Sequence, residues 1–84
     1  MQIDQFDNEL MEILGKRMKS VIEIGKYKKQ NLMTILQTQR WDLILNFRVE
    51  QGLKLGISEE MVMSIFKSIH LESINKQEEI LSKP

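Results

Sequence analysis

The chain has 84 residues, and its 12 basic and 12 acidic side chains give a formal net charge of zero. This length allows one domain, and the balanced charge lacks the basic excess typical of nucleic-acid-binding proteins. The lack of Cys and the single His exclude disulfides, thiolate zinc sites, cysteine catalysis and a multi-histidine metal site. We therefore expect no metal. No apolar run reaches about 18 residues, so we also expect a cytoplasmic protein with no membrane span.

The scarcity of turn residues predicts helices. Four Gly and one Pro, the last residue of the chain, are too few for the frequent turns of a β protein. The helical period is lost over residues 30–38, and residues 52–58 hold two glycines. We therefore predict an all-α fold with one long helix, at residues 3–29, and two shorter helices, at 39–51 and 59–82.

Capping residues mark the ends of the two shorter helices. Ser58, followed by Glu59 and Glu60, is typical of a helix N-terminus, where side-chain oxygens and acidic groups are favoured. Thr38 is expected to cap the second helix, and Gly52 to end it as a left-handed residue.

The length of the first helix indicates a dimer. A helix over residues 3–29 is about 40 Å long, whereas a compact chain of this size has a radius of gyration of about 12 Å. Two shorter helices cannot cover so long an apolar stripe. We predict that a second copy covers it, in an intertwined helical homodimer.

Cations interrupt the apolar face of the first helix. Arg17 and Lys28, three turns apart, fall in the middle of this face. A single cation there would be explained by a long side chain that reaches solvent from the edge of the core. Two cations centred in the stripe make a binding role as plausible as that explanation. Buried cations need anionic partners. The apolar face itself is formed by Ile3, Phe6, Leu10, Ile13, Leu14, Val21 and Ile24.

The other helices repeat this pattern. Arg40 lies within the apolar face of the second helix, although an Arg at a helix start can simply reach solvent. Ser73 and Gln77 lie along or beside the apolar face of the third helix, although local hydrogen bonds could satisfy each of them. His70, at the edge of that face, is expected to be structural or part of a pocket wall. With no carboxylate near the centres of these faces, we predict a buried pocket for a ligand with two carboxylates or phosphates.

The stretch from Ile3 to Ile80 resembles the all-helical (type II) chorismate mutases, small dimeric proteins found alone or fused to other shikimate-pathway enzymes. The segments IDQFDNELMEILGKRM and VIEIGKYKK are similar to the first helix of that family, and HLESINKQ to its third helix. The combination ILQ…RW resembles the branch fused to deoxyheptulosonate-phosphate synthase. The resemblance implies one domain over residues 1–84, excised from a longer bifunctional protein of aromatic amino-acid biosynthesis, with no cofactor.

The resemblance also implies roles for the inward polar residues. Arg17 matches the arginine that binds a substrate carboxylate, and Ser73 matches a serine at a carboxylate. Lys28 and Gln77 match the pair at the ether oxygen of the breaking bond, which makes them catalytic together with Arg17. Arg40 matches the arginine of the second helix beside the site.

Two departures from the family pattern stand out. Well-known members carry Asp-x-x-Arg-Glu in the second helix, where this chain has Gln37 at the Asp position and Trp41 at the Glu position. We place both with the substrate-binding residues, although Trp41 lies about 100° around the helix from Arg40, which favours packing. The arginine that the family supplies from the partner protomer would fall just before Met1.

Three hypotheses follow. The first is a chorismate mutase, an isomerase that converts the small dianion chorismate to prephenate by electrostatic stabilisation, with weak activity expected for this chain alone. The second is a regulatory or docking domain of a shikimate-pathway enzyme, which binds a metabolite or a fused synthase domain with little catalysis. The third, a dimerisation module without a ligand, leaves the inward cations unexplained.

Overall fold

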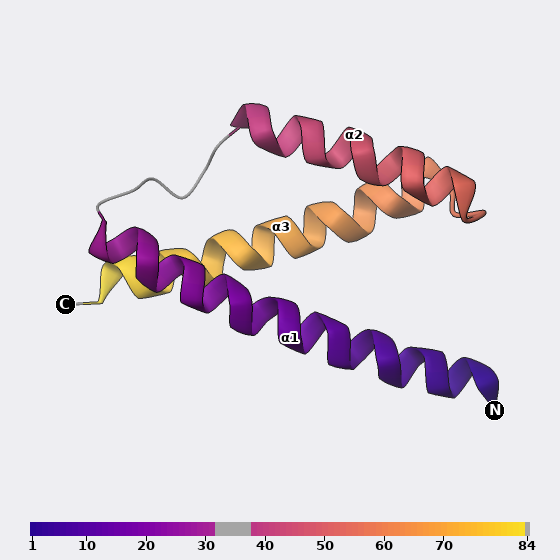
Figure 1. Cartoon of the computed structure of the whole chain (residues 1–84), viewed down its shortest axis with the longest axis horizontal. Coiled ribbons are helices and arrows are strands. Elements are labelled where there is room, and N and C mark those ends of the chain that lie inside the picture. The colour runs from indigo at the N-terminus through magenta and orange to yellow at the C-terminus, as the bar shows by residue number, and fades with distance from the viewer. Residues whose placement is uncertain (32–37, 84) are drawn as a thin grey trace.

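The computed structural model describes residues 1–31 and 38–83, and within them it contains three helices and no strand. They are α1 (Gln2–Gln30), α2 (Thr38–Lys54) and α3 (Glu59–Ser82), drawn in chain order in Figure 1. The predicted all-α architecture of one long and two shorter helices is therefore confirmed. None of the three described helices is long and apolar enough to cross a membrane.

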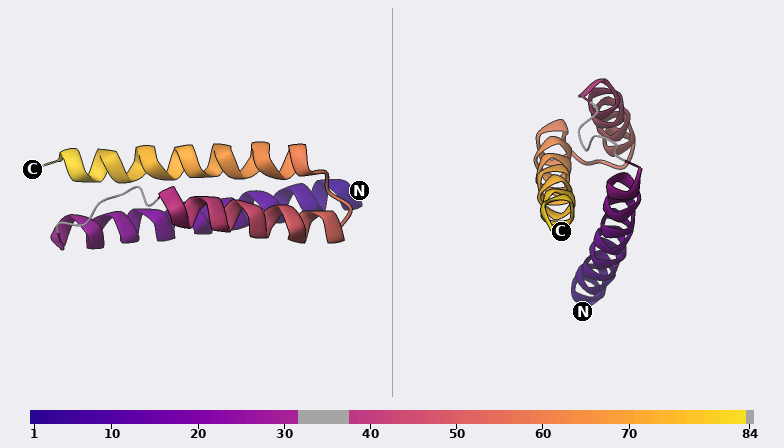
Figure 2. Two further views of the ribbon diagram at one scale, coloured as in Figure 1. Left: turned by 90° about the horizontal axis from the view of Figure 1, so that it is seen from above. Right: turned by 90° about the vertical axis from the view of Figure 1, so that its left-hand side faces the viewer.

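Helix α3 holds the other two helices together. Both α1 and α2 pack against α3, while no packing between α1 and α2 is found in the described part of the chain. Figure 2 shows α3 on one side of the molecule and α1 and α2 on the other, with extents of 45 × 30 × 14 Å. The N-terminal half of α1 runs away from both partners, as Figure 1 shows. The interior therefore lies along α3 and leaves half of α1 outside it.

The end of α2 differs from the prediction. The helix continues past Gly52 to Lys54, so the expected left-handed role of Gly52 is wrong. The left-handed residue is Gly56, with a φ of 78°. The Ile57 N–H donates to the Gly52 carbonyl at 2.8 Å and the Gly56 N–H to the Leu53 carbonyl at 3.3 Å, the two bonds of a Schellman motif. The second glycine of the pair therefore stops the helix.

The start of α3 agrees with the prediction. The Ser58 hydroxyl oxygen accepts a hydrogen bond from the Met61 N–H at 3.2 Å, and Glu59 and Glu60 occupy the first turn. The predicted cap at Thr38 is not tested, because Thr38 is the first residue of α2 and its side chain lies outside the described residues.

Two glycines allow the close helix contacts. A Cβ atom on Gly25 of α1 would lie 3.0 Å from the Ile80 Cδ1 and 3.1 Å from the Gln77 Cγ of α3. A Cβ atom on Gly52 of α2 would lie only 2.4 Å from the Cγ2 of Val62, also in α3. The distance at Gly52 leaves no room for a Cβ atom, and the distances at Gly25 leave very little. Gly52 therefore serves the α2–α3 contact, and Gly25 sets how closely α3 approaches α1.

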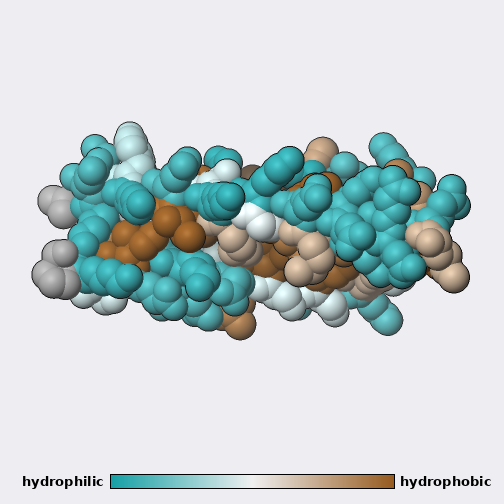
Figure 3. Space-filling model, turned by 90° about the horizontal axis from the view of Figure 1, so that it is seen from below, coloured by the Kyte–Doolittle hydropathy of each residue, from teal (hydrophilic) through white to brown (hydrophobic). Residues whose placement is uncertain are grey.

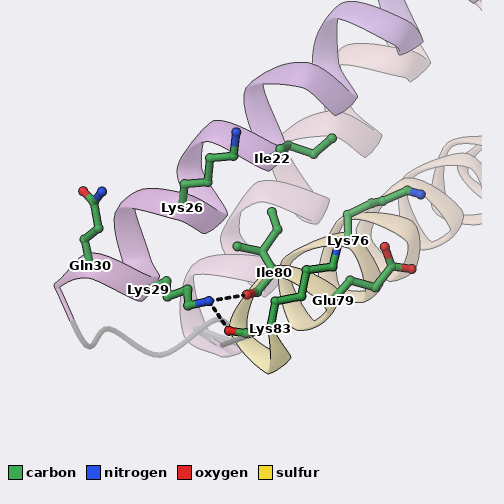
Figure 4. A pocket seen from close by; sticks show the side chains of 8 residues that line it. All are labelled: Ile22, Lys26, Lys29, Gln30, Lys76, Glu79, Ile80 and Lys83. Atoms are coloured by element: carbon green, nitrogen blue, oxygen red, sulfur yellow. Dashed lines mark hydrogen bonds between the residues drawn. The ribbon is translucent and has the colours of Figure 1, made fainter.

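The C-terminal ends of α1 and α3 meet at a cluster of lysines. The Lys29 ammonium group donates to the Ile80 carbonyl at 3.1 Å and to the Lys83 carbonyl, as Figure 4 shows. It thus binds the end of α3, whose own last turn has no basic residue. A cavity of about 750 Å³ lies at this end of the molecule, and Lys26, Lys76 and Lys83 line it together with Lys29. The Lys29 cation therefore offsets the negative end of α3, which gives it a structural role.

Replacing Gly52 with Ala should lower the free energy of unfolding by about 1–3 kcal/mol, because the new methyl group would overlap Val62. The matched control is Gly15→Ala in α1, where a Cβ atom meets nothing within 4 Å. That change should instead raise stability by about 0.5–1 kcal/mol through helix propensity. Urea unfolding at one fixed protein concentration measures both. Equal stability of Gly52→Ala and wild type would contradict the packing role of Gly52.

Candidate active site

A cavity of about 400 Å³ lies between the three helices and gathers the predicted site residues. Of the seven candidates, only Gln37 is not placed, because it lies outside the described residues. No carboxylate is found among the described lining residues, which include three cations. The lining is Arg17, Val21, Ile24 and Lys28 from α1, Arg40, Trp41 and Ile44 from α2, and Phe66, His70, Ser73, Ile74 and Gln77 from α3.

Gln77 bridges α3 to α1 inside this cavity. Its carbonyl oxygen accepts a hydrogen bond from the Lys28 ammonium group at 3.2 Å, and its amide nitrogen donates to the Val21 carbonyl at 3.3 Å. The side chain is buried, with 6% of its surface exposed. Both contacts depend on the close approach of the two helices at Gly25. Lys28 and Gln77, predicted from separate helices, therefore form one hydrogen-bonded pair.

Arg17 and Ser73 form a second polar pair. One terminal nitrogen of Arg17 donates to the Ser73 hydroxyl oxygen at 3.2 Å, and that hydroxyl donates to the Ile69 carbonyl at 2.7 Å. The two explanations that the sequence left open for Ser73, a local backbone bond and a place in the pocket, both hold. A bound carboxylate would have to draw the hydroxyl proton away from Ile69, since a hydroxyl has only one hydrogen to donate.

Trp41 and His70 form a stacked pair of rings across α2 and α3. Their ring centroids are 3.8 Å apart, and the ring planes differ by 8°. Trp41 thus both packs and lines the cavity, whereas its angular position on the helix favoured packing alone. His70 belongs to the pocket wall, one of its two predicted roles. The stack itself was not predicted, because spacing within one helix says nothing about ring contacts between two helices.

Burial and charge disfavour protonation of His70. The first cause is the partial burial of the ring between α2 and α3, and the second is the positive charge of Arg17. Together they lower the pKa of His70 from its ordinary value of 6.5. The imidazole is therefore neutral at neutral pH in the absence of a ligand.

The cavity is more open than the predicted buried pocket. Arg17 and Arg40 are exposed and Lys28 is half-buried, so the expectation of buried cations is wrong for the two arginines of a single chain. The physical reason is that α1 and α2 diverge and do not pack against each other in the described part of the chain, as their ribbons in Figure 1 show.

Arg48 is not itself a lining residue of the cavity, but it contacts one, which was not predicted from the sequence. Its guanidinium carbon lies 5.3 Å from the Phe47 ring centroid and 5.8 Å from that of Phe66, which lines the cavity. One terminal nitrogen also donates to the Gln51 side-chain oxygen at 2.9 Å. The only signal in the sequence was the three-residue spacing of Arg48 and Gln51, which places them on one helix face.

The family described as "Chorismate mutase type II" matches residues 1–78. The chain belongs to this family. The predicted family is therefore confirmed, while the branch fused to deoxyheptulosonate-phosphate synthase stays a prediction.

Curated relatives agree with this assignment. The chain is 31% identical over 72 residues to the T-protein of Haemophilus influenzae, covering 86% of this chain and 19% of that protein. It is 27% identical over 82 residues to a bifunctional chorismate mutase/prephenate dehydratase of Buchnera aphidicola, covering 98% and 21%. The chain thus spans about a fifth of the length of these relatives. No solved structure matches significantly.

The lowered pKa of His70 predicts how stability depends on pH. The unfolded chain, with a pKa near 6.5, binds a proton more tightly than the folded chain. The stabilising contribution of neutral His70 is therefore complete above pH 6.5 and is lost as the pH falls through the lower, folded-state pKa. Thermal unfolding of wild type and His70→Phe at pH 7.5 and 5.5 measures this effect. The variant, which keeps an aromatic ring against Trp41, should lose less stability; equal losses would contradict the prediction.

Proposed function

We propose that this domain catalyses the rearrangement of chorismate to prephenate. The observation that carries the proposal is the Lys28–Gln77 pair, hydrogen-bonded at 3.2 Å in a cavity whose described lining has three cations and no carboxylate. Family membership supports it. The domain would cover residues 1–84 and act without a cofactor.

The protein does not have to form or break any covalent bond with the substrate in this reaction. One carbon–oxygen bond breaks while one carbon–carbon bond forms in the same molecule, so no nucleophile, proton transfer or cofactor is required. The protein has to hold a dianion in its compact conformer and stabilise the negative charge that grows on the ether oxygen. Rigid helices that carry cations suit both tasks, because their donors are already oriented before the substrate arrives.

Lys28 and Gln77 are the donors for the ether oxygen in this proposal. The hydrogen bond to Gln77 fixes the Lys28 ammonium group, which has three hydrogens to donate. The Gln77 amide nitrogen directs one of its two hydrogens at Val21, so the proposed role uses the other one. The contact with Val21 therefore orients the donor and does not compete with it.

Arg17, Arg40 and Ser73 are the groups proposed for the two carboxylates. Arg17 and Arg40 project from different helices into one cavity, so each can take one carboxylate of a dianion. Ser73 would add a hydrogen bond once its hydroxyl turns from Ile69 toward the ligand. Gln37 and Trp41 complete the proposed substrate-binding set.

Lys28→Ala should reduce kcat by about 100-fold or more, the effect of removing one preorganised donor. The matched control is Lys26→Ala, which removes an equal charge from α1 two residues away but lines the other cavity, at the lysine cluster. Chorismate disappearance, followed by absorbance, measures both variants. Full turnover by Lys28→Ala, or an equal loss in Lys26→Ala, would show that Lys28 does not have the role proposed here.

A second candidate function is a binding domain with little catalysis. Trp41, at the position where well-known members carry Glu, and the exposure of Arg17 and Arg40 favour it. Chorismate turnover and thermal shift with prephenate separate the two functions. Turnover supports the mutase, and stabilisation without turnover supports the binding domain.

We also propose that two copies assemble through the N-terminal half of α1. Apolar side chains there are largely exposed in one chain, including Ile3 at 63%, Phe6 at 58% and Leu10 at 53%. The only buried hydrophobic side chains among the described residues are Val21, Leu45 and Val62. Figure 3 shows bands of hydrophobic side chains framed by hydrophilic ones on one face. A second chain would bury this surface and cover the open side of the cavity.

Sedimentation analysis tests the homodimer. Wild type should sediment at twice the 9.9 kDa of one chain, while Phe6→Asp combined with Leu10→Asp should shift toward the monomer. The matched control, Gln5→Glu with Asn8→Asp, adds the same charge on the polar side of the same turns and should stay dimeric. A wild type of 9.9 kDa at every concentration would contradict the dimer.

The proposed setting is aromatic amino-acid biosynthesis in the cytoplasm. The relatives are several times longer than this chain, and the one from Buchnera aphidicola is named as bifunctional, which supports a domain of a longer protein. Deoxyheptulosonate-phosphate synthase as the fused enzyme rests only on the ILQ…RW pattern.

A further inference from the structure

The single His and the single Trp of this chain are in contact with each other in the cavity wall. His70 comes from α3 and Trp41 from α2, and their rings stack with a centroid distance of 3.8 Å. The proposed reaction uses no proton transfer, so it gives His70 no task. A half-buried imidazole in the wall of a cationic cavity is therefore the one titratable group of this site whose role is still open.

Every other charged group that lines the cavity with His70 is positive. Helix α1 contributes Arg17 and Lys28, helix α2 contributes Arg40, and α3 adds no charged lining residue besides His70 itself among the described residues. Protonation of His70 in the empty cavity would place a fourth positive charge beside these three. Like charges in one site disfavour the charged form of each group.

We propose that His70 is a proton-linked anion-binding residue, neutral in the empty cavity and protonated when a dianion binds beside Arg17, Lys28 and Arg40. The inference rests on the proposed function only for the class of ligand, a small molecule with two carboxylates.

The linkage follows from the charges. Two carboxylates offset the repulsion from Arg17, Lys28 and Arg40, so an occupied cavity favours the imidazolium form. By reciprocity, the ligand then binds more tightly when His70 carries its proton. Stacking on Trp41 is compatible with both states, because an indole face attracts a cation. The lowered pKa of His70 in the absence of a ligand agrees with a neutral imidazole in the empty cavity.

Prephenate binding as a function of pH tests the linkage. Trp41 is the sole Trp, so its fluorescence reports occupancy of this cavity, and titrations between pH 5.5 and 8.5 give the Kd. The carboxylates of the ligand stay ionised over this range. In wild type, prephenate should bind at least about fivefold more tightly at pH 5.5 than at pH 8.5, the lower end of typical coupling.

Two variants separate His70 from other titrating groups. His70→Phe keeps an aromatic ring against Trp41 but cannot be protonated, so its Kd should vary less than about twofold over the same range. Lys67→Gln removes an exposed charge one turn earlier on α3, outside the cavity lining, and should follow wild type. A flat wild type, an unchanged slope in His70→Phe, or no prephenate binding by wild type would each overturn the proposal.

A second measurement needs no variant. The NMR signals of the sole imidazole should give a pKa below 6.5 in the free protein and a higher pKa with saturating prephenate. An unchanged pKa would overturn the linkage. Chorismate turnover in the same samples judges the proposed function separately. Turnover without linked binding leaves the mutase and removes the role of His70, whereas linked binding without turnover leaves His70 and removes the mutase.

Discussion

The close approach of α1 to α3 at Gly25 is the contact on which the rest of the site depends. Because Gly25 has no side chain, the backbone of Gln77 comes within 3.4 Å of where a Cβ atom would be. At that distance the Gln77 amide reaches the Val21 carbonyl and the Lys28 ammonium group at once. A wider spacing would leave a buried amide without partners, which is costly in a protein interior. Packing and the proposed donor pair therefore have one cause.

Charge is arranged around this contact with a clear asymmetry. The ion pairs found among the described residues, Met1 with Asp4 and Lys76 with Glu72, are local pairs on helix surfaces. At the lysine cluster, the Lys29 cation meets carbonyl groups at the end of α3, so its counter-charge is internal. In the cavity, the neutral groups Ser73 and Gln77 contact the cations Arg17 and Lys28. Neutral partners orient a cation without cancelling its charge, and this preserves its attraction for an anionic ligand.

The described chain has a flat, extended shape and a small hydrophobic core. Its extents of 45 × 30 × 14 Å and its few buried hydrophobic side chains mean that three helices enclose little apolar surface. Helix α3 has a partner on two sides, but the N-terminal half of α1 has none in the described chain (Figure 2). The open cavity and the exposed apolar stripe therefore have the same origin, the divergence of α1 from the other two helices.

The periodicity of the sequence was sufficient to predict the helices and several of their ends. The Ser58 cap follows from local chemistry, because the side chain and the backbone it binds are three residues apart. Gly52 and Gly56 show the limit of such local arguments. Both glycines suit a helix end, and only the position of Val62 in another helix explains why Gly52 stays inside α2. The same limit applies to Trp41 and His70, whose contact joins two helices.

The sequence by itself determined the helical class and the inward direction of Arg17, Lys28, Arg40, Ser73 and Gln77, since the angle between residues on one helix is set by its 3.6-residue period. It also determined the family, through motifs spread over most of the chain. Only the tertiary structure decided which of these side chains pair, how far the cavity opens, and that His70 stacks on Trp41. These features depend on the distances between separate helices and on how the helices cross. Side-chain volumes at contacts such as Gly25 and Gly52 set that geometry, and the periodicity along one helix does not determine it.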